Sequence, residues 1–180
     1  MKNILICLFV LFIISESSNE ETLTWDANNK LTWADFKASP DKESDAVALT
    51  ASGITFGYSV QTTGKRIVEF STIVESHFYP NKSWYIKAKS DVHILGHEQL
   101  HFDITELYAR KFRQQISELQ VNQNVKKQLN KLHEDINVEL RDAQKKYDLE
   151  TQHSMDAVKQ REWFNYVEKE LNSLEEFKSL

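Results

Sequence analysis

The sequence predicts an α+β fold in which a small, mostly antiparallel N-terminal sheet is followed by three helices. Residues 18–89 contain short runs of β-branched and aromatic residues separated by turn-forming residues, a pattern typical of strands. Residues 90–180 carry apolar side chains at spacings of three and four, which indicates amphipathic helices. Both prolines and every glycine except Gly96 fall before residue 90. We therefore expect one domain over residues 18–180, mostly β up to residue 89 and helical from residue 90.

The first 17 residues have the features of a secretory signal peptide. Lys2 supplies a positive charge, and an apolar run follows from Ile4 to Ile14. This run is too short to span a bilayer, and Ser15 and Ser17 offer a small-residue cleavage site. We expect a secreted or periplasmic protein with no stable membrane insertion after cleavage. The alternative is an uncleaved membrane anchor.

The N-terminal half should contain several short strands and one long hairpin. Residues rich in Val, Ile, Thr, Phe and Tyr form two long segments on either side of the turn at 63–65, and these segments predict an antiparallel pair. Gly53 and Gly57 are candidate β-bulges within the first of them. The expected strand segments are, in order, 22–25, 31–33, 46–61, 66–74 and 83–86.

Three helices should follow. Ser90 and Asp91 are good capping residues for a first helix that ends near Leu119. The second helix has an apolar stripe formed by Val125, Leu129, Leu132, Ile136, Leu140, Ala143 and Tyr147. The third is marked by Val158, Trp163, Phe164, Val167, Leu171 and Leu174.

The most specific motif is the pentad His97-Glu98-Gln99-Leu100-His101, an HExxH pattern. On a helix, residues four apart lie about 40° apart around the axis, so both imidazoles reach toward one point. Two such nitrogens can hold Zn²⁺, and Glu98 is then placed as the general base that takes a proton from water. The pattern predicts a zincin-like active-site helix with His97 and His101 as metal ligands and Glu98 as the catalytic residue.

A catalytic zinc site needs a third protein ligand, and the mature chain must supply it without cysteine. Cys7 is the only cysteine and lies in the predicted signal peptide, so only His, Asp and Glu remain as donors. His93 is unsuitable, because His93, His97 and His101 would span about 12 Å along one helix. Glu106 lies on the opposite side of the same helix from His97.

The third ligand should therefore come from another element. His133 flanks the apolar stripe of the second helix and is one candidate. The stretch 147–153 offers two more, Glu150 and His153. We favour His153 as the third ligand, with Glu150 as the alternative.

Several segments resemble a family of uncharacterised secreted bacterial proteins, DUF922, described as predicted zinc-dependent proteases. The most specific is the HExxHFD block at residues 97–103, which continues through Glu106-Leu107-Tyr108. Further matching segments are Leu31-Thr32-Trp33-Ala34-Asp35-Phe36, Ser83-Trp84, and residues 147–153 with Gln160 and Trp163. The resemblance implies metal and catalytic roles for the pentad and favours His153 as a site residue. Ser154 departs from the pattern, where a glycine is expected.

These observations predict a secreted zinc metallopeptidase whose partner is a peptide or protein substrate. The net charge of −5 argues against a nucleic-acid partner, because phosphate binding requires a basic surface. One alternative is a non-catalytic envelope binding or scaffold module with a structural or inactive zinc site. Another is a zinc amidase acting on cell-wall peptides. The sequence gives no indication of the oligomeric state.

Overall fold

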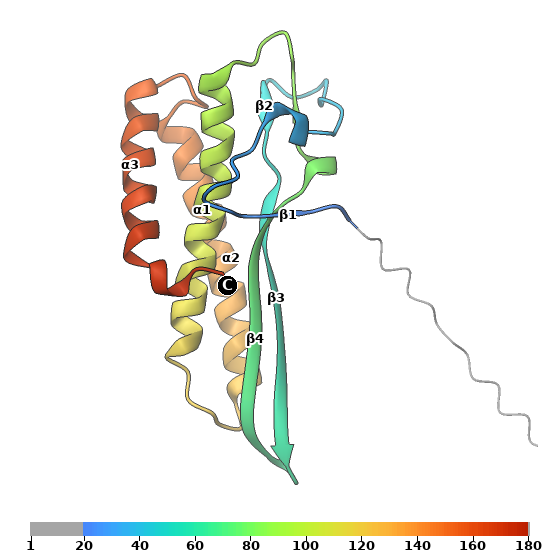
Figure 1. Cartoon of the computed structure of the whole chain (residues 1–180), viewed down its shortest axis with the longest axis vertical. Helices are drawn as coiled ribbons and strands as arrows, with labels where there is room; N and C mark the ends of the chain where they lie inside the picture. The colour runs from blue at the N-terminus through green and yellow to red at the C-terminus, as the bar shows by residue number, and fades with distance from the viewer. Residues whose placement is uncertain (1–19, 180) are drawn as a thin grey trace, which may run out of the picture.

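The computed structural model describes residues 20–179, and it has the α+β architecture expected from the sequence. A long β-hairpin lies along one side of a layer of three helices (Figure 1). The predicted signal peptide, residues 1–17, lies outside the described residues. Within 20–179, none of the helices combines the length and the hydropathy that crossing a membrane requires.

The predicted hairpin is confirmed, although its first strand begins later than expected and its second strand ends later. Strands β3 (Ser52–Thr63) and β4 (Arg66–Phe78) pair antiparallel, and Gly64 at the turn has a φ of 61°, which favours glycine. The short β1 (Leu23–Thr24) pairs with the other edge of β4, giving the order β1-β4-β3. Strands β2 (Ala48–Leu49) and β5 (Trp84–Tyr85) form a separate antiparallel pair.

Two details of the predicted β half are wrong. Gly53 and Gly57 occupy regular positions opposite β4, and the register shift falls between Gln61 and Thr62 instead. Residues 31–33 do not form a strand. The side chain of Asp35 accepts hydrogen bonds from the backbone N–H and the hydroxyl of Thr32 and caps the 3₁₀ turn η1 (Trp33–Asp35). This local capping competes with strand pairing at a Thr-Trp sequence that otherwise favours β structure.

The three helices lie within a few residues of their predicted bounds. Helix α1 (Val92–Ser117) is capped by Asp91, whose carboxylate accepts from the backbone N–H of Ile94 at 2.9 Å. Helix α2 (Val125–Glu150) and helix α3 (Ala157–Ser173) follow. Two further single turns are η2 (Pro80–Lys82) and η3 (Glu175–Phe177).

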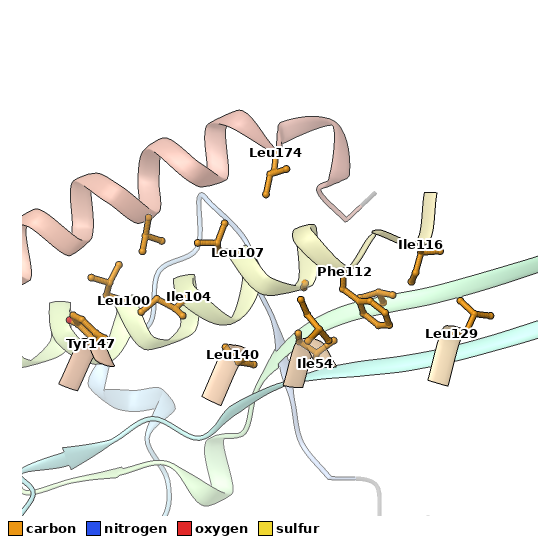
Figure 2. Packing of buried hydrophobic residues seen from close by; sticks show 14 of the residues in the cluster. Ile54, Leu100, Ile104, Leu107, Phe112, Ile116, Leu129, Leu140, Tyr147 and Leu174 are labelled. Atoms are coloured by element: carbon orange, nitrogen blue, oxygen red, sulfur yellow. The ribbon is translucent and has the colours of Figure 1, made fainter. Parts of the chain in front are cut away.

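Helix α1 occupies the centre of the molecule, because it packs against β3, β4, α2 and α3 (Figure 1). Its apolar side chains meet those of α2, α3 and the hairpin in one continuous core (Figure 2). The core reaches from Ile116 at the far end of α1 to Tyr147 near the end of α2. A second cluster of Leu31, Phe36, Phe78 and Phe102 holds the N-terminal segment against α1. This packing fixes α1 relative to α2, and the pentad lies at their contact.

Candidate metal centre

Two histidines of α1 and one aspartate of α2 converge on one point. The Nε2 atoms of His97 and His101 lie 3.2 and 2.9 Å from the same carboxylate oxygen, Oδ1 of Asp148. One ligand atom from each of the three residues lies within 4.8 Å of the others, so the group could hold a metal ion. His97 and His101 meet because they are one helical turn apart, and Asp148 reaches them because α2 packs antiparallel along α1.

The charges of this group depend on one another. Burial raises the pKa of Asp148, but the hydrogen bonds from His101 and His97 outweigh it and hold that pKa well below its usual range. Burial likewise lowers the pKa of His101, yet its contact with Asp148 and the charge of Glu98 bring the net pKa above its ordinary value. Asp148 is thus an anion that attracts a cation to the two imidazoles.

Glu98, between the two histidines in the pentad, is buried close enough to His101 for its charge to raise the pKa of that imidazole. Its side chain is 5% exposed, and within residues 20–179 its Oε2 atom has no hydrogen-bond partner. The Nδ1 atom of His97 is also buried without a partner among these residues. A buried carboxylate oxygen without a partner costs free energy unless another group satisfies it. An oxygen of this kind is suited to accept a hydrogen bond from a molecule bound at this group.

The side chains of Tyr147 and Gln144, both on α2, hold the two imidazoles in position. The ring of Tyr147 stacks on His97 at a centroid distance of 4.5 Å and meets the edge of His101 at 4.8 Å. Burial, with the nearby charge of Glu98, raises the pKa of Tyr147 far above its ordinary value, so the phenol stays neutral. Gln144, one turn before Asp148 on α2, is hydrogen-bonded to His101 Nδ1.

The structure places His153, the expected third ligand, beside this group rather than in it. Its side chain is 77% exposed, and its Nδ1 lies 3.8 Å from Asp148 Oδ1. It follows α2 in a turn in which Gln152, His153 and Ser154 all have positive φ values of 49°, 52° and 72°. Among the residues described, the ligand group comprises His97, His101 and Asp148 and does not include His153.

Glu150, the alternative ligand, is also outside the group and has other partners. Its carboxylate accepts from Trp163 Nε1 at 2.8 Å and lies 3.8 Å from Lys146 Nζ. The ring of His133 is half-buried and packs against both Phe56 and Phe112.

Helix geometry argued against His93 and Glu106 as third ligands, and both residues have other partners in the structure. His93 Nε2 is hydrogen-bonded to the carbonyl oxygen of Ser154 at 2.7 Å. Glu106 is buried and forms ion pairs with Arg110 and Arg113. Neither His93 nor Glu106 belongs to the ligand group.

Asp148 is the residue that sequence reasoning passed over. It follows Tyr147, the last apolar residue of the α2 stripe, and it lies four residues after Gln144. Because residues four apart share one face of a helix, Gln144 and Asp148 meet the histidine face of α1 together. A search for carboxylates next to the apolar stripe of α2 would have found it.

The family model described as "Bacterial protein of unknown function (DUF922)" matches residues 24–154, which include the β3–β4 hairpin, α1, α2 and all three candidate ligand residues. No curated protein and no solved structure matches the chain.

Proposed function

The chain belongs to the DUF922 family of bacterial proteins of unknown function, and from this premise we propose that it is a zinc-dependent hydrolase, specifically a secreted metallopeptidase. The observation that carries the proposal is the convergence of His97, His101 and Asp148 beside the unpartnered carboxylate of Glu98. In this proposal Asp148 takes the place of the third ligand that the sequence assigned to His153. His153 then stands at the rim, where a bound substrate would meet it.

The donor set supports zinc. Catalytic zinc sites use three nitrogen or oxygen ligands and leave a fourth position open. Ligand atoms around a tetrahedral zinc with bonds of about 2.0 Å lie roughly 3.3 Å apart. The distances of Asp148 Oδ1 to the two Nε2 atoms, 3.2 and 2.9 Å, are close to that separation. Asp148 is also 33% exposed, so the site opens to solvent on its side.

Zinc bound there would lower the pKa of a water molecule toward neutrality and polarise a substrate carbonyl. His97 and His101 would bind through Nε2, and Asp148 through Oδ1. Glu98 would accept a proton from the attacking water at Oε2 and deliver it to the leaving amine. The ring of Tyr147 would exclude water from the inner side of His97.

The edge of the sheet supports a peptide as the substrate. Within the described residues, the edge of β3 that faces away from β4 has no strand partner. This strand begins beside the ligand group, because Ser52 contacts Thr105 of α1 at 2.7 Å and Thr50 donates to the carbonyl oxygen of Glu98 at 3.2 Å. An extended peptide could add to this edge through backbone hydrogen bonds and so bring its scissile bond near Glu98.

Zinc analysis and point variants test the proposal. We expect one zinc per chain in the purified protein, retained in Glu98→Gln, which should lose peptidase activity. Asp148→Asn should weaken zinc binding far more than His153→Ala, and Glu150→Gln serves as a matched carboxylate control outside the group. The absence of stoichiometric zinc would refute the proposal. If Glu98→Gln binds zinc and leaves the phenotype of the cells unchanged, a non-catalytic binding module would be favoured instead.

A further inference from the structure

The hydrogen bonds of Gln144 determine which nitrogen of His101 carries a proton. The amide nitrogen of Gln144 donates to the carbonyl oxygen of His101 at 2.8 Å and to Thr105 Oγ1 at 3.2 Å. A backbone carbonyl can only accept, so the amide nitrogen must face it and the amide oxygen must face His101 Nδ1. An amide oxygen also only accepts, so His101 Nδ1 carries the proton of this hydrogen bond.

The other nitrogen of His101 is thereby left for a cation. With the Nδ1 proton donated to Gln144, the lone pair of a neutral ring lies at Nε2, which faces Asp148 Oδ1 at 2.9 Å. A lone pair and a carboxylate oxygen at this distance repel each other unless a positive charge lies between them. A proton or a metal ion at Nε2 satisfies both atoms.

The two histidines are positioned by different means. His97 Nδ1 has no hydrogen-bond partner within residues 20–179, and its ring is held by stacking on Tyr147. His101 has a hydrogen-bond partner on α2 that also bonds to its own backbone. Gln144 therefore fixes the position of the His101 side chain relative to its own main chain.

We propose that Gln144 is a positioning residue of the metal site: its amide oxygen keeps the proton of His101 on Nδ1 and thereby leaves Nε2 to the metal. This inference rests on the proposed function in that the bound ion is taken to be zinc. The proton remains on Nδ1 whether a proton or zinc occupies Nε2. Groups that orient a ligand histidine in this way typically change metal affinity by about 10- to 100-fold when they are removed.

The test compares Gln144→Met, which keeps the length of the side chain without an acceptor of comparable strength, with Thr105→Val. The control removes a hydroxyl from the same hydrogen-bonded cluster but leaves the contact between Gln144 and His101 intact. Zinc affinity measured by competition with a chelator should fall about 10- to 100-fold in Gln144→Met. It should change only slightly in Thr105→Val. Equal losses in the two variants would overturn the proposal.

A second readout is independent of zinc binding. In the nitrogen-15 and proton spectra of the wild type, His101 should show a slowly exchanging Nδ1–H. It should be present in the zinc-loaded protein and in the metal-free protein at mildly acidic pH, and be lost in Gln144→Met. Absence of this proton in the wild type would overturn the role of Gln144, even if the variants fail to fold. Failure of the wild type to bind zinc would instead overturn the proposed function, while the Nδ1–H signal still decides the role of Gln144.

Discussion

The ring of Tyr147, rather than its hydroxyl, should hold His97 in place, and a pair of substitutions separates the two contributions. Tyr147 is fully buried and lies between His97 and Trp163, with centroid distances of 4.5 and 5.4 Å. Its hydroxyl lies 3.4 Å from the carbonyl oxygen of His97, which is longer than a normal O–H···O hydrogen bond. Tyr147→Ala removes the ring and the hydroxyl, whereas Tyr147→Phe removes the hydroxyl alone.

The expected costs differ several-fold. Truncation of a fully buried aromatic residue to alanine lowers the free energy of unfolding by about 3–5 kcal/mol, because contacts are lost and a cavity remains. The hydroxyl should contribute less than about 1 kcal/mol, since its single hydrogen bond is long and its acceptor lies inside a helix. Because His97 Nδ1 has no partner within residues 20–179, loss of the ring should also weaken zinc binding.

Urea denaturation of the metal-free variants measures the first effect, and chelator competition measures the second. We expect Tyr147→Phe to stay close to the wild type in both assays. Tyr147→Ala should lose stability and zinc affinity together. If Tyr147→Phe lost as much zinc affinity as Tyr147→Ala, the hydroxyl and not the ring would be the positioning group, and the reasoning would be refuted.

Four further outcomes are expected. Ser154→Gly should raise the free energy of unfolding by up to about 1 kcal/mol in denaturation experiments, because φ at this position is 72° and glycine adopts such values without strain. Phe112→Ala should lower it by about 3–5 kcal/mol in the same assay, since this ring is fully buried in the core. In the metal-free protein, the pair of Asp148 and His101 should stabilise the fold most between the ordinary pKa values of 3.8 and 6.5. The contribution of Asp148 is lost as pH falls through its lowered pKa, and that of His101 as pH rises through its raised pKa, so the melting temperature should fall on both sides of this range. Zinc must replace the Nε2 proton of His101, so the gain in melting temperature on adding zinc should grow as pH rises above 6.5.

Local patterns in the sequence were sufficient to predict most of the fold. The turn at Gly64 and the alternating residues around it predict the hairpin, and Asp91 predicts where α1 begins. These features depend on neighbours in the sequence, which is why the pattern reveals them. The error at residues 31–33 has the same origin, because the competing hydrogen bonds of Asp35 act over only three residues but change the backbone from strand to turn.

The candidate site could be predicted only in the part that lies on one helix. His97, Glu98 and His101 share a face of α1 because of their spacing, so their proximity follows from helix geometry alone. The position of Asp148 depends on the rotation and register of α2 against α1, which are set by packing of side chains that lie far apart in the sequence. The sequence argument favoured His153 as the third ligand, but such a preference could not reveal how α2 packs against α1.

Ser154 lies in the turn that follows α2 and includes His153. The resemblance to the DUF922 family calls for a glycine there, and the positive φ values of residues 152–154 supply the physical reason. His153 in this turn is exposed at the surface, while Asp148, five residues earlier, stays against the histidines of α1. The backbone N–H of His153 still donates to the carbonyl oxygen of Asp148 at 2.8 Å, so the turn and the ligand are joined through the main chain.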